Sequence, residues 1–193
     1  MYKIEYSSSF ITTEDYVDKY LDIPTVTGYC QNCNNYNKSW ACPPFDFDQK
    51  AYLLQKKYLN LLYKKIIFDE VSVSKIYSKE ELDKIVDDVI NGEKYSLAMK
   101  LFEYEDLYHD SISISAGSCN LCQDEVCSKL EGNECRNSSK LRYSLEALGG
   151  IVGKTIQDLS GIELLWVEEG KLPSYFVLVS GLLSNEIINF EEL

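Results

Sequence analysis

Seven cysteines, gathered in two short stretches, limit most strongly what this chain can fold into. The first stretch has the pattern C-x2-C-x8-C and the second the pattern C-x2-C-x4-C-x7-C; their members are Cys30, Cys33 and Cys42, then Cys119, Cys122, Cys127 and Cys135. A C-x2-C pair lets one tight turn direct two sulfurs at the same centre, and crowded thiolates repel one another unless a cation neutralises them. The spacing therefore predicts seven metal ligands in two groups.

An odd number of cysteines argues against a disulfide framework, which would leave one spare thiol. The N-terminal region has no basic segment followed by an apolar run, so no signal peptide is predicted. No stretch approaches the roughly 18 consecutive apolar residues that a membrane span requires. We therefore expect a soluble, cytoplasmic protein without membrane association, in a compartment that keeps thiols reduced.

The identity of the metal is only partly constrained, because soft thiolates suit both iron and zinc. Zinc knuckles often carry glycine after the C-x2-C pair, whereas Asn34 and Gln123 follow here. The Cys42-Pro43 dipeptide is similar to the end of the bacterial ferredoxin motif. These features favour an iron–sulfur cluster of the [4Fe–4S] type, with zinc as the alternative and thiol redox chemistry as a third possibility.

The number of ligands raises a question about the first group. Two complete clusters require about eight thiolates, and the chain has seven. Either a non-cysteine ligand from Asp46, Asp48 or His109 completes the set, or one metal position stays open to water or substrate. The simpler alternative for the first group is a structural staple closed by a carboxylate. For His109, an interaction with the dipole of a preceding helix is an adequate structural explanation.

Three residues beside the cysteines are candidate cofactor-binding residues. Trp40 could shield a cluster from water, or simply anchor its loop on the core. Lys38 and Arg136 could balance the negative charge of a cluster, or lie solvated on the surface. The sequence does not separate these roles.

The net charge of −12 and the pI of about 4.6 exclude general binding to a phosphate backbone. An acidic surface could instead direct the protein towards a basic partner, which we expect to be a redox partner protein. The oligomeric state is not determined by the sequence.

The order of predicted elements indicates one α+β domain over residues 1–193, with a mostly antiparallel sheet packed against helices. The cysteine-rich loops are expected at about residues 28–47 and 117–136. Helices are predicted over residues 12–21, 48–57, 78–108 with a break near Asn91 and Gly92, 141–148, and 151–160 closed by Gly161. Strands are predicted over residues 61–74, 111–115, 162–167 and 175–183, the last two forming a hairpin.

Several of these motifs, in this order, closely resemble the predicted metal-binding proteins grouped as domain of unknown function 2284. In the first stretch, the C-x2-C pair leads through Tyr36, Lys38 and Trp40 to Cys-Pro-Pro, as in that family. The second half carries its Gly-x-Cys-x2-Cys and Cys-Arg elements. Residues 142–147, Arg-Tyr-Ser-Leu-Glu-Ala, are similar to its Arg-Pro-Ser-Met-Glu-Ala element. The resemblance spans residues 29–183 and implies metal binding, while it leaves the reaction open.

Two positions depart from the family pattern: Tyr143 replaces a usual proline and Asn37 a frequent glycine. Neither is a proposed ligand. Ser144 and Glu146 lie two residues apart and cannot both face one site from a helix, so a capping or supporting role is expected for them.

The function predicted from these features is electron transfer or redox sensing by a cysteine-ligated metal protein. The alternatives are an enzyme or activating factor that uses a three-cysteine centre with an open position, and a zinc-stapled interaction module. Whether the chain is an enzyme stays open at this point.

Overall fold

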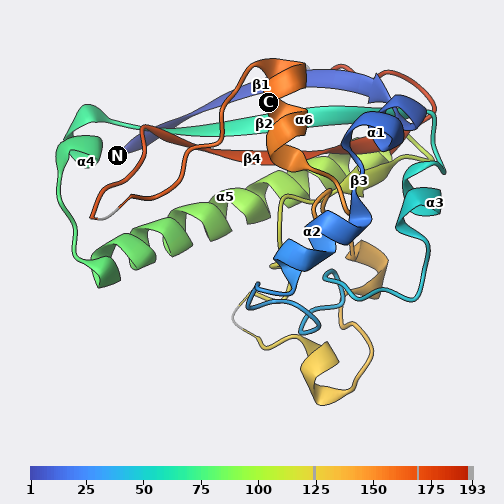
Figure 1. Cartoon of the computed structure of the whole chain (residues 1–193), viewed down its shortest axis with the longest axis horizontal. Helices are drawn as coiled ribbons and strands as arrows, with labels where there is room; N and C mark the ends of the chain where they lie inside the picture. The colour runs from blue at the N-terminus through green and yellow to red at the C-terminus, as the bar shows by residue number, and fades with distance from the viewer. Residues whose placement is uncertain (124, 169, 191–193) are drawn as a thin grey trace.

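The computed structural model describes residues 1–123, 125–168 and 170–190, in which six α-helices accompany one four-stranded antiparallel sheet (Figure 1). The strands are β1 (Tyr2–Thr12), β2 (Tyr58–Phe68), β3 (Ile112–Ile114) and β4 (Tyr175–Ser184), in the order β1-β2-β4-β3. The helices are α1 (Thr13–Tyr20), α2 (Ile23–Cys30), α3 (Gln49–Leu53), α4 (Glu70–Ser74), α5 (Lys79–Leu107) and α6 (Val152–Ser160). The predicted α+β fold with an antiparallel sheet is confirmed.

Strand β2 forms the centre of the sheet because both of its neighbours pair with it over ten or more residues. Its side chains alternate between the two faces, so that Leu61 packs in one hydrophobic core and Leu62 in the other. Helices α1 and α6 cover the first face, through residues such as Tyr16 and Ile156. Helix α5 covers the second face through Leu97 and its neighbours. The result is a three-layer arrangement with the sheet in the middle.

Strand β1 was not predicted, because its sequence includes the polar run Ser7-Ser-Ser9 and most of its side chains are exposed. It is an edge strand whose pairing with β2 runs from Tyr2 opposite Phe68 to Thr12 opposite Tyr58. The segment adopts the strand conformation because its backbone hydrogen-bonds to β2, and its own hydrophobic pattern does not explain the strand.

Helix α5 begins with a capping box, in which Ser78 and Glu81 exchange hydrogen bonds. The predicted break near Asn91 and Gly92 is wrong, since the helix continues to Leu107. Glycine inside a helix costs only about 1 kcal/mol. Packing of α5 along the sheet outweighs that cost, and an ion pair joins Glu93 to Lys64 of β2 at this point.

Three further predictions of local structure are wrong. Strand β2 ends at Phe68, and residues 70–74 form α4 because the Asp69 carboxylate accepts the Ser72 N–H as a helix cap. Residues 141–148 form a turn rather than a helix. Residues 162–167 are not a strand, so the predicted hairpin does not form and β4 pairs with β2 and β3 instead. Glu169, within the proposed hairpin turn, lies outside the described residues.

The other predictions agree more closely with the structure. Helix α1 matches the helix predicted over residues 12–21, and α3 is shorter than the helix predicted over residues 48–57. In the structure, Thr12 caps α1 and Asp48 caps α3. Helix α6 ends at Gly161, whose φ of 68° permits the left-handed closing turn. None of the described helices has the length and apolar character that would let it cross a membrane.

The two cysteine-bearing segments lie together on one side of the sheet, beyond α2 (Figure 1). Residues 31–48 and 117–136 consist mainly of turns, with one short 3₁₀-helix (Ser128–Glu131) in the second segment. The remaining cysteine, Cys30, is the last residue of α2, so the start of the predicted first loop is helical.

Candidate metal centre

The first cysteine segment is positioned by α2. The carboxylate of Asp22 accepts the N–H of Thr25 and caps the helix at its start. A tight turn follows its end, in which the Cys33 N–H donates to the Cys30 carbonyl at 2.9 Å. The Asn35 N–H then donates to the Cys33 Sγ at 3.5 Å. The C-x2-C spacing thus gives the turn that the sequence predicts, with a donor directed at one sulfur.

Three cysteines, Cys30, Cys33 and Cys42, line one cavity of about 180 Å³. The other residues of its wall are Asn35, Tyr36, Pro43, Gly117, Ser118, Ser144, Glu146 and Ala147. No three His, Cys, Asp or Glu side chains among the described residues converge closely enough to hold a single metal ion. The fold therefore arranges these three thiols around a space.

The thiol of Cys42 is strongly affected by its surroundings. Burial is the main reason that its pKa is raised to about 11. A hydrogen bond with Ser39 opposes this rise, while the neighbouring cysteines of the same cavity and Cys119 of the second segment add to it. Thiols in such a setting are neutral at pH 7 unless a cation stabilises the thiolate.

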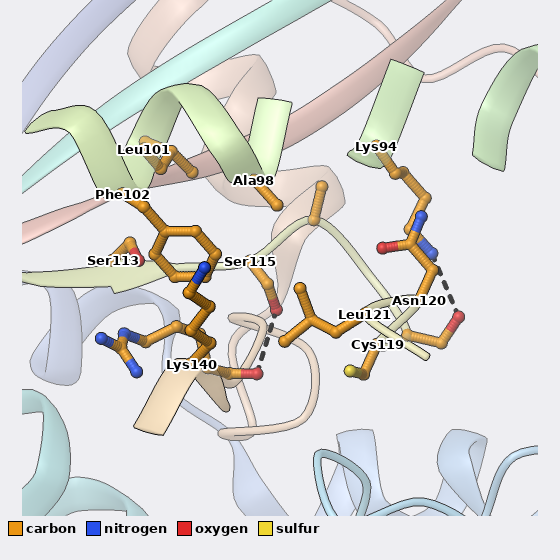
Figure 2. A pocket seen from close by; sticks show the side chains of 13 residues that line it. Lys94, Ala98, Leu101, Phe102, Ser113, Ser115, Cys119, Asn120, Leu121 and Lys140 are labelled. Atoms are coloured by element: carbon orange, nitrogen blue, oxygen red, sulfur yellow. Dashed lines mark hydrogen bonds between the residues drawn. The ribbon is translucent and has the colours of Figure 1, made fainter. Parts of the chain in front are cut away.

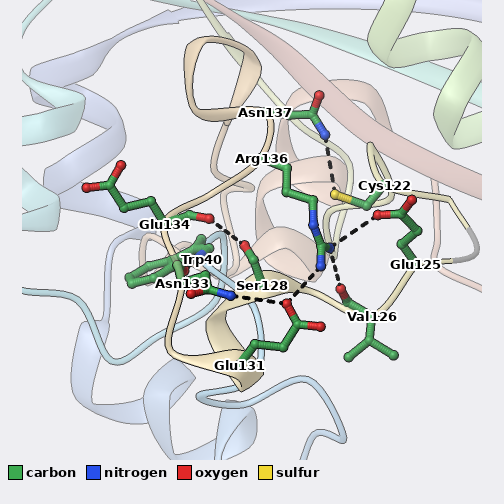
Figure 3. A network of polar contacts seen from close by, with 10 residues as sticks. All are labelled: Trp40, Cys122, Glu125, Val126, Ser128, Glu131, Asn133, Glu134, Arg136 and Asn137. Carbon is green, nitrogen blue, oxygen red and sulfur yellow. Dashed lines mark hydrogen bonds and ion pairs between the residues drawn. The ribbon is translucent and has the colours of Figure 1, made fainter.

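In the second segment, Cys119 is near enough to the other three cysteines to interact with them electrostatically. Burial raises the pKa of the Cys119 thiol, a backbone hydrogen bond from Leu121 opposes it, and the other three cysteines of the segment add to the rise. In addition, the Asn137 side-chain amide donates to the Cys122 Sγ at 3.3 Å (Figure 3). Such hydrogen bonds to sulfur are one way in which a protein adjusts the properties of a thiolate-bound centre.

Several contacts of Trp40 and Lys129 join the first segment to the second. The indole of Trp40 donates to the Asn133 carbonyl at 3.2 Å, and the ammonium of Lys129 donates to the Ser39 carbonyl at the same distance. The Lys129 ammonium also lies 5.5 Å from the centroid of the Trp40 ring. The two cysteine segments are therefore one structural unit.

The buried side chain of Lys94, on α5, lies beside the second segment (Figure 2). Its ammonium donates to the Ser118 hydroxyl at 3.1 Å. Burial lowers the pKa of this amine, and the nearby Glu146, Cys119 and Cys42 act against that change. A positive charge at this place would partly compensate the negative charge of thiolate ligands.

A family model of predicted metal-binding proteins, DUF2284, matches residues 18–183. The chain belongs to this family. The match covers both cysteine segments and the turn with Glu146 between them and α6. No curated protein and no solved structure matches the chain.

In this member of the family, all seven predicted ligands are free thiols, six of them partly buried and Cys33 exposed. Their role as metal ligands stays a prediction. The thiolate-rich donor set fits a soft metal or an iron–sulfur cluster.

The three candidate cofactor-binding residues differ in their surroundings. Lys38 is exposed. Trp40 lies between the two segments and contacts the second through Asn133. Arg136 contacts the backbone of Val126 and the carboxylates of Glu131 and Glu125, and so braces the second segment (Figure 3). The contacts of Trp40 anchor its loop on the second segment, and its role in shielding a centre stays a prediction.

The candidates for an additional ligand do not line the three-cysteine cavity. Asp46, Asp48 and His109 are exposed, and the Asp48 carboxylate is engaged as the cap of α3. Glu146, for which a supporting role was expected, lies in the cavity wall instead. Ser144 has the expected capping role, because its Oγ accepts the Ala147 N–H.

Sequence reasoning missed Lys94 and Lys129 altogether. Lys94 reaches the cysteine segments only through the tertiary fold. Lys129 belongs to the second segment, but its contact with Ser39 of the first segment depends on the tertiary fold. For Glu146, the Ser-x-Glu-Ala element in the family resemblance was the available signal.

A second, larger cavity of about 470 Å³ adjoins the three-cysteine cavity and shares Gly117 and Glu146 with it. Its walls are mainly apolar and come from α5, β4 and residues 164–167. Among the described residues of this wall, Lys94 is the one with a basic side chain. An apolar cavity of this size with a few polar groups has the character of a small-molecule site.

Proposed function

We propose that this protein is an iron–sulfur protein that transfers electrons or senses redox state. Four cysteines of the second segment would hold a cubane cluster, and Cys30, Cys33 and Cys42 would bind a second centre. The observation that carries the proposal is the arrangement of seven free thiols in two adjacent groups, with Cys42 and Cys119 close enough to interact electrostatically.

The cavity between the first three thiols supports iron–sulfur over zinc. Four ligands of a zinc ion must lie within about 2.3 Å of one point. In a cubane cluster each thiolate binds a different iron, so the ligands stand around a body of cluster atoms. A cavity of about 180 Å³ between Cys30, Cys33 and Cys42 suits the second arrangement.

Bound clusters would accept and release single electrons. The chain itself would set their properties: Asn35 and Asn137 donate to cluster-bound sulfurs, and Trp40 and Lys129 hold the two centres side by side. Hydrogen bonds and positive charge near the sulfurs raise a reduction potential. The net charge of −12 suits a basic redox partner. Because free thiols need reducing conditions, we assign the protein to the cytoplasm.

A second candidate function is that of an enzyme or activating factor which binds a small molecule at the first centre. The adjoining apolar cavity of about 470 Å³ favours it. A substrate in that cavity would have an apolar body and would approach the three-cysteine centre past Gly117 and Glu146.

The decisive experiment is iron, zinc and acid-labile sulfide analysis of protein purified without oxygen. We expect a brown protein with iron and sulfide in equal amounts, and about half of the iron in each of the variants Cys42→Ser and Cys122→Ser. A colourless protein with stoichiometric zinc would instead support the zinc-stapled module. Retention of one cluster with loss of small-molecule binding in Cys42→Ser would favour the enzyme.

A further inference from the structure

The carboxylate of Glu146 has one oxygen that is buried without a hydrogen bond. Its Oε2 is shielded from solvent and has no hydrogen-bond partner among the described residues. Glu105, by comparison, accepts hydrogen bonds from Ser113 and Arg142. Leaving a buried acceptor unsatisfied costs about 1–3 kcal/mol, and more for a charged group. The Glu146 Oε2 is therefore a free acceptor that a bound cation would satisfy.

Glu146 lines the three-cysteine cavity together with Cys30, Cys33 and Cys42. In the described part of the chain, these thiols are the one group of potential metal ligands beside Glu146. Lys94 is near enough to interact electrostatically, but its ammonium donates to Ser118 and forms no ion pair with Glu146 within 4.0 Å. Glu146 and the three thiols thus belong to the wall of one cavity.

The backbone holds Glu146 firmly at this place. On either side of it, Leu145 and Leu148 are buried in the hydrophobic core. The turn that carries it is closed by a hydrogen bond of 2.7 Å from the Gly150 N–H to the Leu145 carbonyl. Side chains on such a fixed turn are preorganised ligands, because little conformational freedom is lost on binding.

We propose that Glu146 is the fourth protein ligand of the first centre, and that it completes a set of eight ligands with the seven cysteines. The inference rests on the proposed iron–sulfur function and adds to it a specific carboxylate ligand. Carboxylate oxygen is a harder ligand than thiolate. The iron bound to Glu146 is therefore held less tightly than the three bound to Cys30, Cys33 and Cys42.

The test replaces Glu146 by its neutral isostere, with a matched control nearby. In Glu146→Gln, the first cluster loses the iron at the carboxylate corner, so the iron content falls from about eight to about seven atoms per chain. The oxidised variant then shows the electron paramagnetic resonance signal of a three-iron cluster. Glu134→Gln, an exposed position next to Cys135, leaves the iron content and the spectrum unchanged. An unchanged iron content in Glu146→Gln would overturn the assignment.

A second measurement uses the wild-type chain and does not depend on the folding of a variant. In protein with ¹³C at the glutamate carboxyl carbons, pulsed electron paramagnetic resonance of the reduced first centre detects a coupled carboxyl carbon if Glu146 is bound. The absence of that coupling would overturn the proposal.

The metal content of the wild type separates this inference from the proposed function. Zinc in place of iron would overturn the function alone, and loss of one zinc ion from Glu146→Gln but not from Glu134→Gln would then still support the ligand. A wild-type chain that binds no metal at all would overturn both.

Discussion

The indole Nε1 of Trp40 donates a hydrogen bond of 3.2 Å to the backbone carbonyl of Asn133, 93 residues further along the chain, and so links the two cysteine segments. Lys129 lies against the same indole ring and donates to the carbonyl of Ser39. The relative position of the two groups of thiols therefore depends on a few polar contacts between turns. Any property that requires both groups at once should depend on these contacts.

Replacement of Trp40 by phenylalanine removes the hydrogen bond and keeps an aromatic ring. We expect the free energy of unfolding to fall by about 1 kcal/mol, the usual contribution of one hydrogen bond. Amide hydrogen exchange should become faster in both cysteine segments. Trp166→Phe is the control, because Trp166 is 76% exposed. Equal effects of the two substitutions would show that the Trp40 contact has no special role.

The proximity of Cys42 and Cys119 predicts magnetic interaction between the two reduced centres. Electron paramagnetic resonance of the reduced wild type should show a spectrum broadened by spin coupling. Cys42→Ser, which disrupts the first centre, should leave the simpler spectrum of the second centre alone. A wild-type spectrum equal to the sum of those of Cys42→Ser and Cys122→Ser would contradict the prediction.

The Glu105 carboxylate predicts a dependence of stability on pH. Burial alone would raise its pKa, but hydrogen bonds from Arg142 and Ser113 outweigh burial and lower it from 4.5. A lowered pKa in the folded state contributes stability above pH 4.5, and this contribution is lost as the pH falls through the folded-state value. Chemical denaturation between pH 7 and pH 3 should show the loss in the wild type.

The variant Glu105→Gln should be less stable than the wild type by about 2–3 kcal/mol at pH 7, because Arg142 loses its charged partner. The difference should shrink as the pH falls below 4.5. Glu103→Gln is the control on the same helix, since Glu103 forms an exposed pair with Lys100. A similar loss of stability in both variants would count against the special role of Glu105.

Gly149 allows the turn with Glu146 to pack against the helix that carries Cys30. Its φ is +95°, and an added Cβ would lie 2.6 Å from the side chain and 2.9 Å from the Cα of Ile23 at the start of α2. We expect Gly149→Ala to lower the free energy of unfolding by about 2–4 kcal/mol. Because α2 would have to move, the first centre should also lose metal.

Gly92→Ala is the matched control, because no atom lies within 4 Å of its added Cβ. This change should stabilise α5 by about 0.5–1 kcal/mol through the better helix propensity of alanine. Differential scanning calorimetry and metal analysis of both variants test the pair. Full metal content in Gly149→Ala would show that α2 tolerates the displacement.

Local chemistry made part of the fold predictable from the sequence. Thr12 and Asp48 are helix caps because their side-chain oxygens accept nearby N–H groups, and the Ser78 capping box works over the same short range. The C-x2-C turn at Cys30 and Cys33 is another such local arrangement. These features involve residues only two to four positions apart, so the sequence contains the information needed to predict them.

Tertiary packing decided what the sequence pattern could not. Strand β1 has a polar run at Ser7–Ser9 and forms because it pairs with β2. Helix α5 continues through Gly92 because its packing against the sheet outweighs the low helix propensity of glycine. Residues 141–148 have helical spacing of leucines, yet they form a turn whose Leu145 and Leu148 fill the core.

For the candidate site, the sequence by itself identified the seven cysteines, their two groups and the family, because thiolate spacing is a local signal. Only the tertiary structure placed Glu146 and Lys94 beside the cysteines and joined the two groups through Trp40. The physical reason is that these contacts connect residues from 24 to more than 100 positions apart. Such neighbours are selected by the packing of the whole chain, and no short pattern in the sequence specifies them.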